Sequence, residues 1–202
     1  MKGSALDRLF SVAAQQGGYF TTAQARRAGL PSKLVWYHAR RSRFARVGQG
    51  IYRFRQYPSS PYDHLVEAWL TAGPAAVVSH ESALSLYGLS NVVPAFVHLT
   101  VPRSYRRVGR RIPRGVKLHT TTRPLRRDDI VSRGPVPATV PGRAIVDSAE
   151  AGTAPEQIFM AVRQALDQGL VTRRELLALA RRRSKRVAQL VQRAMEDAAD
   201  DL

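Results

Sequence analysis

The sequence of 202 residues contains no cysteine. Without thiols the chain cannot form a disulfide, a cysteine-ligated zinc site or a catalytic thiolate. The absence also fits a protein of a reducing compartment. Any chemistry of the chain must therefore come from its charged, aromatic, hydroxyl and histidine side chains.

Long apolar runs are missing as well. A membrane-spanning helix needs about 20 consecutive apolar residues, and no stretch of the chain approaches that length. The N-terminus, MKGSALDRLF, lacks the continuous apolar core of a signal peptide because Asp7 and Arg8 interrupt it. We expect no membrane partner and a cytoplasmic location.

Acidic residues are scarce. Lys and Arg number 32 against 15 Asp and Glu, which gives a net charge of +17 and an isoelectric point of about 11.4. A field of this sign attracts polyanions, and nucleic acid is the usual one. Arginine far outnumbers lysine, so the free use of arginine in GC-rich genomes is an alternative explanation of the charge.

The positive charge is concentrated in two blocks. Residues 1–57 hold 11 Lys and Arg against one acid, and residues 101–142 hold 11 against two. Residues 58–100 hold three acids and no Lys or Arg, and residues 143–202 are nearly balanced, with 10 against nine. This distribution indicates nucleic-acid binding more strongly than the total does, because the first block coincides with a DNA-binding pattern.

That pattern is a helix, a turn, a second helix and a hairpin over residues 19–54. A hydroxyl residue, Thr21 or Thr22, caps the first short helix, and Pro31 prevents its continuation. Ser32 is expected to cap a basic and aromatic helix over residues 32–43. Such a layout is typical of a winged helix-turn-helix, which places one helix in the DNA major groove and a hairpin beside it.

The hairpin is expected around Gly48-Gln49-Gly50, between FARV at 44–47 and IYRFR at 51–55. Phe44 and Val47 do not alternate cleanly, so the first strand is expected to be irregular. DNA contacts are expected from polar and aromatic residues outside the apolar stripe of the second helix and from the wing. These residues are Ser32, Lys33, Trp36, Tyr37, Arg40 and Arg41 on the helix and Arg46, Gln49 and Arg53 on the wing.

The remainder of the chain reads as a mixed α/β region. A Pro- and Ser-containing linker, YPSSPYDH at 57–64, predicts a boundary between a winged-helix DNA-binding domain at 1–57 and an α/β domain at 58–202. Strands are expected near 95–101 and 115–122, further short strands over 128–140, and helices from 141 to the C-terminus. The predicted fold class is α+β, an N-terminal winged helix followed by a mixed domain that ends in helices.

No constellation of residues predicts catalysis. His80-Glu81 begins like a zinc-protease helix, but Leu84 stands where the second histidine of that motif would be. Asp147 and Glu150 share a helix face with Arg143, a spacing at which ion pairs are far commoner than metal sites. His98 and His119 have no partner at ligand spacing, and each is expected to be a satisfied or interface histidine. We therefore predict neither an enzyme nor a cofactor or metal.

The second basic block is open to three interpretations. It could be a second phosphate-contacting arm, a solvated loop, or a patch for an acidic protein partner. Its residues are Arg103, Arg106, Arg107, Arg110 and Arg111.

The first 57 residues resemble the N-terminal domain of the AbiEi-type antitoxins of type IV toxin–antitoxin systems. The resemblance is carried by GGYFTTAQARRAGL at 17–30, by the basic helix after it, and by FARVGQGIYRF at 44–54. Val47, Gly50, Ile51 and Tyr52 fill the wing pattern of that family, whereas Trp36 and Tyr37 stand where the family is usually basic. The later SHESALSLYGLS at 79–90 resembles the start of the family's C-terminal domain.

The resemblance implies a specific role. Such antitoxins repress their own operon by binding inverted repeats, and their C-terminal domain neutralises a nucleotidyltransferase toxin. The leading hypothesis is therefore an autorepressing antitoxin with double-stranded DNA and a cognate toxin as partners. The alternatives are a protein-binding neutraliser whose winged helix is only a scaffold and, less favoured, an enzyme that acts on nucleic acid.

Overall fold

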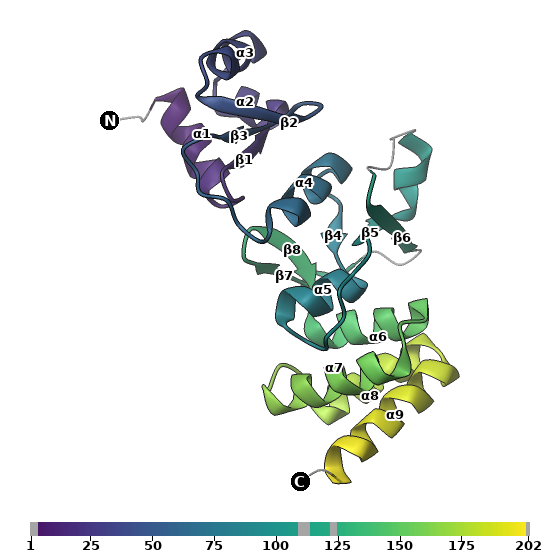
Figure 1. The fold of residues 1–202 in the computed structure, drawn as a ribbon. Helices are drawn as coiled ribbons and strands as arrows, with labels where there is room; N and C mark the ends of the chain where they lie inside the picture. Colours follow the sequence, from purple (N-terminus) through teal and green to yellow (C-terminus); the bar gives the residue numbers. More distant parts are fainter. Residues whose placement is uncertain (1–3, 109–113, 122–124, 201–202) are drawn as a thin grey trace. The chain divides into compact units, whose positions relative to one another are not determined.

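A computed structural model describes residues 4–108, 114–121 and 125–200 (Figure 1). The chain divides into two compact units, the first made of residues 1–76 with 132–136 and the second of 77–131 with 137–202. The predicted fold class is confirmed, because helices and mixed sheets are both present and the chain ends in helices. No helix in the described part of the chain is long and apolar enough to cross a membrane.

The first unit has the element order of a winged helix-turn-helix with one helix added. Its three strands form an antiparallel sheet in the order β1-β3-β2. The elements are α1 (Ala5–Ala14), β1 (Tyr19–Thr21), α2 (Thr22–Arg27), α3 (Ser32–Arg40), β2 (Phe44–Gly48), β3 (Ile51–Phe54) and α4 (Asp63–Ala72).

Side-chain caps explain where the first two helices begin. The hydroxyl of Ser4 accepts a hydrogen bond from the Asp7 amide, and the Asp7 carboxylate accepts one from the Ser4 amide. Thr21 and Gln24 form the same reciprocal capping box at α2. Each box satisfies two amides that a helix N-terminus would otherwise leave without partners.

The start and end of α3 differ from the prediction. Pro31, not Ser32, is the N-cap residue, and no side chain caps the helix. The fixed φ angle of proline suits this position, so Ser32 becomes the first helical residue. The helix ends at Arg40 rather than near residue 43, because Ser42 adopts a φ of +58°, outside the right-handed helical region.

Aromatic rings fill the core between α1, α2, α3 and the sheet. The rings of Phe20, Phe44 and Phe54 lie 4.8–5.4 Å apart, centroid to centroid, and all three side chains are buried. Such edge-to-face and tilted contacts add to the free energy of burial. Alternation fails after Phe44 as predicted, since a register irregularity lies between Arg46 and Gly48 and leaves Val47 exposed.

The second sheet has five strands in the order β6-β5-β4-β8-β7. β5 and β6 are parallel, β4 and β8 are parallel, and β4 and β5 are antiparallel. The elements after α4 are β4 (Val77–Val78), α5 (His80–Tyr87), β5 (Val97–Pro102), the 3₁₀ helix η1 (Arg103–Val108), β6 (Val116–Thr121), the 3₁₀ helix η2 (Arg127–Asp129), β7 (Ile130–Arg133), β8 (Val136–Thr139), α6 (Pro141–Ala151), α7 (Pro155–Asp167), α8 (Arg173–Arg183) and α9 (Lys185–Asp200).

The last four helices pack on one another, and α5 packs on α6 (Figure 1). α6 occupies the centre of this layer, and its residues from Ala144 to Ala149 are all buried. Asp147 is among them, so the predicted ion pair with Arg143 lies in the interior rather than on a helix surface. Arg183 pairs with the same carboxylate, which compensates the burial of its charge.

The predicted linker lies inside the first unit. α4 follows it and contacts β1, β2 and β3, and the Tyr19 hydroxyl donates a 2.9 Å hydrogen bond to Glu67 on α4. The domain boundary after residue 57 stays a prediction.

Candidate nucleic-acid interface

The predicted recognition surface lies on α3. Val35 alone among the residues of this helix is fully buried, and it points into the aromatic core. The exposed side chains recur at the three- to four-residue spacing of one helix face, and Trp36 and Tyr37 are 56% and 44% exposed. The structure brings together on this face six predicted residues, Ser32, Lys33, Trp36, Tyr37, Arg40 and Arg41, all of which are exposed.

Two stacked pairs order the cations of this surface. The Arg40 guanidinium lies 4.9 Å from the centroid of the Trp36 ring, and the Arg41 guanidinium lies 5.0 Å from that of Tyr37. Both pairs are four residues apart, so one turn of helix sets each stack. An exposed cation–π contact of this kind contributes about 0.5–1 kcal/mol. Trp36 and Tyr37 therefore hold the two arginines in place.

The electrostatics of α3 favour an anion. Across the described residues, Lys33, Arg40 and Arg41 have no acidic partner, so their charges face solvent. No side chain caps the first turn, and the positive end of the helix dipole adds to the field there. Burial and the nearby Arg43 lower the pKa of His38, so this histidine at the edge of the face is neutral.

A backbone hydrogen bond connects the wing to the helix-turn-helix. Gln49 and Gly50 form the turn between β2 and β3, and Gly50 has a φ of +71°, which glycine adopts without strain. The Gly50 carbonyl accepts a 2.9 Å hydrogen bond from the amide of Thr22, the first residue of α2. Arg46 and Gln49, which are predicted to contact DNA, are exposed on this wing.

Arg53 is placed differently from the other wing residues. Its guanidinium lies 3.5 Å from the Asp63 carboxylate and donates a 2.6 Å hydrogen bond to the Pro58 carbonyl. It also lies 5.1 Å from the centroid of the Tyr19 ring. The Arg53 side chain is thus bound to the linker and to α4, so the proposed interface does not include it.

The second basic block is described only in part. Arg103 is exposed at the start of η1, and the backbone of Arg106 and Arg107 continues that helix. Arg110 and Arg111 lie outside the described residues. The three interpretations of this block therefore stay open.

Sequence reasoning did not include the last turn of α2. Arg26 and Arg27 are exposed there, directly before the turn that leads to α3. The first helix of a helix-turn-helix crosses the DNA backbone, so two cations at its end are suited to phosphate contact. The sequence signal was present in ARRAGL, where both arginines precede the glycine that ends the helix.

One family model matches part of the first unit. Residues 7–55 match the model described as "Transcriptional regulator, AbiEi antitoxin". Over these residues the chain is similar to that family. The match spans α1 through β3, so every predicted DNA-contact residue of α3 and the wing falls within the AbiEi segment. Among curated proteins, none matches the chain.

A solved structure extends the likeness beyond the AbiEi segment. The crystal structure of the RV2827C protein from Mycobacterium tuberculosis is similar to this chain, with a TM-score of 0.57. The similarity covers 96% of this chain and 77% of the RV2827C chain. The two sequences are 17% identical. At this identity the similarity concerns the fold, and it covers residues of both units.

Proposed function

We propose that this chain, whose residues 7–55 match the AbiEi family model, is a DNA-binding transcriptional repressor that recognises inverted repeats in its own promoter. The observation that carries the proposal is the exposed face of α3, where Lys33, Arg40 and Arg41 lie beside two aromatic rings with no acidic partner among the described residues. Arginine and lysine reach guanine edges and phosphates, and aromatic rings contact thymine methyl groups and sugars. Arg46 and Gln49 on the wing extend this surface.

The test is a titration of promoter DNA with the full-length protein at several salt concentrations. Each phosphate contact contributes about 0.9 to the slope of log affinity against log salt. The double variant Lys33→Ala/Arg40→Ala is expected to bind more weakly and to lower that slope by up to about 2. Arg174→Ala, which removes an exposed arginine of α8, is the matched control and should leave both quantities unchanged.

Two results would contradict the repressor proposal. Equal affinity for the promoter and for a scrambled duplex would remove sequence recognition. Unchanged affinity of the double variant would mean that α3 is not the recognition helix. Cleavage of the duplex by the wild-type chain in the presence of Mg²⁺ would instead favour a nucleic-acid-processing enzyme, which we propose the chain is not.

The proposed antitoxin role is neutralisation of a nucleotidyltransferase toxin. The family match supports an antitoxin, and the class of toxin is part of the proposal. If DNA binding and neutralisation use different surfaces, Lys33→Ala/Arg40→Ala should lose repression of a promoter reporter yet still restore growth of cells that express the toxin. Failure of the wild-type chain to restore growth would contradict this role. Restoration with no promoter binding would favour a neutraliser whose winged helix is a scaffold.

A further inference from the structure

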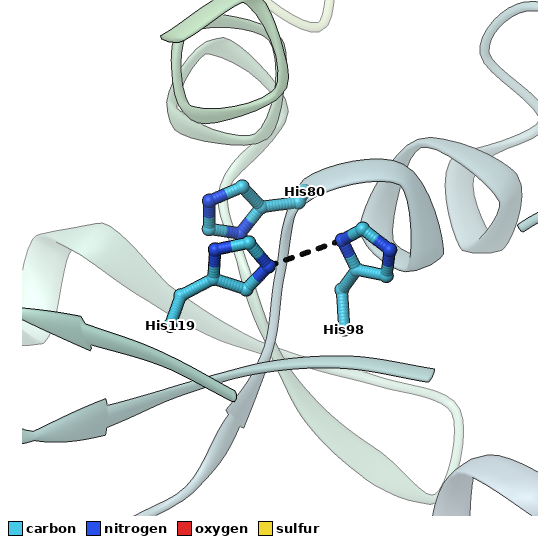
Figure 2. A group of neighbouring side chains, drawn as sticks. All are labelled: His80, His98 and His119. Carbon is cyan, nitrogen blue, oxygen red and sulfur yellow. Dashed lines mark hydrogen bonds between the residues drawn. The ribbon is translucent and has the colours of Figure 1, made fainter. Parts of the chain in front are cut away.

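Three histidines meet in the second unit, outside the proposed DNA interface. One ring nitrogen of each of His80, His98 and His119 lies within 4.8 Å of the others. His80 stacks on His119 with ring centroids 3.5 Å apart, and His98 lies 5.1 Å from His119 (Figure 2). His80 and His98 are buried and His119 is partly buried.

The fold, not sequence spacing, brings these rings together. His98 lies on β5 and His119 on β6, and the parallel register pairs Thr100 with His119 and His98 with Lys117. His80 comes from the first turn of α5, with a φ of +53°. A left-handed backbone at a residue other than glycine costs about 1–2 kcal/mol. Strain of this kind persists where the surroundings hold it and clusters at functional sites.

A hydrogen bond orients the His80 ring, and a longer contact with a carboxylate lies beside the His98 ring. Nδ1 of His80 lies 2.8 Å from the Ser79 hydroxyl oxygen, which also accepts a 2.8 Å hydrogen bond from the Thr100 hydroxyl. Nε2 of His98 lies 3.8 Å from a carboxylate oxygen of Glu81. Metal-ligating histidines characteristically use their second nitrogen in this way, on a hydroxyl, carbonyl or carboxylate. Nε2 of His80 is thereby left to face a ligand, while Nδ1 of His98 is hydrogen-bonded to His119 (Figure 2).

The separation of a His98 and a His119 ring nitrogen fits the binding of both to one metal ion. Nε2 of His119 and Nδ1 of His98 form a 3.2 Å hydrogen bond, whose proton a bound metal ion would displace. Two nitrogens bound tetrahedrally to Zn²⁺ at about 2.0–2.1 Å are about 3.3 Å apart. This pair therefore already spans one edge of a zinc tetrahedron, and a rotation of the His80 ring out of its stack would supply a third ligand.

The protonation state of the rings suits metal binding. Burial lowers the pKa of His80 to about 2 and that of His119 to about 4, and it also lowers the pKa of His98. Neighbouring cations act in the same direction, with Arg143 and Arg183 near His80 and Lys117 near His98 and His119, while Glu81 opposes them at His98. The imidazoles are thus neutral, which is the form that binds metals.

A cavity of about 420 Å³ adjoins two of the rings. His80 and His119 line it together with Thr100, Arg143, Asp147 and Arg183. Both arginines pair with Asp147, so part of their charge is compensated. The cavity gives a path for an ion and room for water or a small anion as a fourth ligand.

We propose that His80, His98 and His119 bind one divalent transition-metal ion of the zinc type, with the fourth coordination position open to this cavity. Imidazole ligands suit Zn²⁺, and three protein ligands with one exchangeable position are a common zinc arrangement. The alternative is a dry cluster of neutral histidines that serves only packing.

Calorimetric titration of tag-free, chelator-treated full-length protein with ZnCl₂ distinguishes the two. One equivalent of Zn²⁺ is expected to bind. His119→Gln, on the edge strand β6, should weaken binding by about 100-fold or more. His64→Gln, which replaces an exposed histidine of α4, is the control and should bind like the wild type. No binding by the wild type, or equal binding by His119→Gln, would overturn the proposal.

Spectroscopy of the wild-type chain keeps the test decisive if His119→Gln fails to fold. Co²⁺ in place of Zn²⁺ should give the intense visible bands of a four-coordinate site, and X-ray absorption of the zinc-loaded protein should give scattering from three imidazoles. A six-coordinate cobalt spectrum, or fewer than three imidazoles, would assign the ion elsewhere and contradict the site. Promoter binding does not enter either readout, so failure here leaves the repressor proposal unaffected.

Discussion

The amide of Thr22 donates a 2.9 Å hydrogen bond to the carbonyl of Gly50. This bond joins the tip of the wing to the first helix of the helix-turn-helix. Because Gly50 also has a φ of +71°, the turn combines a conformation that favours glycine with a fixed contact. The wing is therefore held in one orientation relative to the α2–α3 pair before any DNA is bound.

Gly50→Ala is expected to destabilise the first unit by about 1–2 kcal/mol, because a Cβ is strained at this φ. The new Cβ would also lie 3.2 Å from the Thr22 hydroxyl oxygen. The two tryptophans, Trp36 and Trp69, both belong to this unit, so tryptophan fluorescence in a denaturant titration reports its unfolding. Gly48→Ala is the control, since its Cβ would meet nothing closer than 3.8 Å; equal stability of the two variants would contradict the argument.

Trp36→Ala should reduce affinity for promoter DNA by about 2–5-fold through loss of the stack that orders Arg40. Trp36→Phe keeps an aromatic face under the guanidinium and should retain most of the affinity. Fluorescence anisotropy of labelled DNA measures both. Phe96→Ala removes an equally exposed aromatic side chain from the second unit and should have no effect. A loss in Trp36→Phe as large as in Trp36→Ala would show that stacking is not the cause.

Arg46→Gln and Arg53→Gln should act on different properties. Arg46 is exposed, so its loss is expected to weaken DNA binding without lowering stability. Arg53 pairs with Asp63 and donates to Pro58, so its loss should lower the free energy of unfolding by about 1–3 kcal/mol with little effect on DNA affinity. Denaturant titration and DNA titration of both variants measure the two effects. A loss of DNA affinity in Arg53→Gln without a loss of stability would mean that Arg53 belongs to the DNA interface.

Asp147→Ala should destabilise the second unit by on the order of 3 kcal/mol, because it removes the buried carboxylate that Arg143 and Arg183 share. Far-UV circular dichroism during thermal unfolding measures this effect, since neither tryptophan lies in that unit. Glu150→Ala, an exposed acid on the same helix, should cost about 1 kcal/mol or less. Similar losses in the two variants would mean that Asp147 is not a structural anchor.

Local patterns predicted the first unit well because its elements are set by neighbours in sequence. Capping residues, a proline in the turn and a glycine-rich hairpin each fix only a few residues of backbone. The error at Ser32 has a similar local cause, since proline at the preceding position takes over the N-cap. Arg53 differs, because its partner Asp63 lies on a helix that the predicted boundary assigned to another domain.

The histidine cluster could not be predicted from the sequence. Its members are 18 and 21 residues apart along the chain, separations that match no metal-binding motif. They meet because two strands pair in parallel and a helix begins beside them. Register between strands depends on the whole sheet, and no short pattern in HLTV or KLHT encodes it.

The parallel pairing of Val78 with Ala138 has a consequence for synthesis. The aromatic core of the first unit is drawn from residues up to Tyr57, which are synthesised early. β4 can pair with β8 only after Ala138, 60 residues further along the chain, has been synthesised. At roughly 5–20 residues per second, Ala138 is made about 4–16 s after Tyr57. During that interval every residue of the proposed DNA interface has already been synthesised, whereas the second sheet still lacks β8.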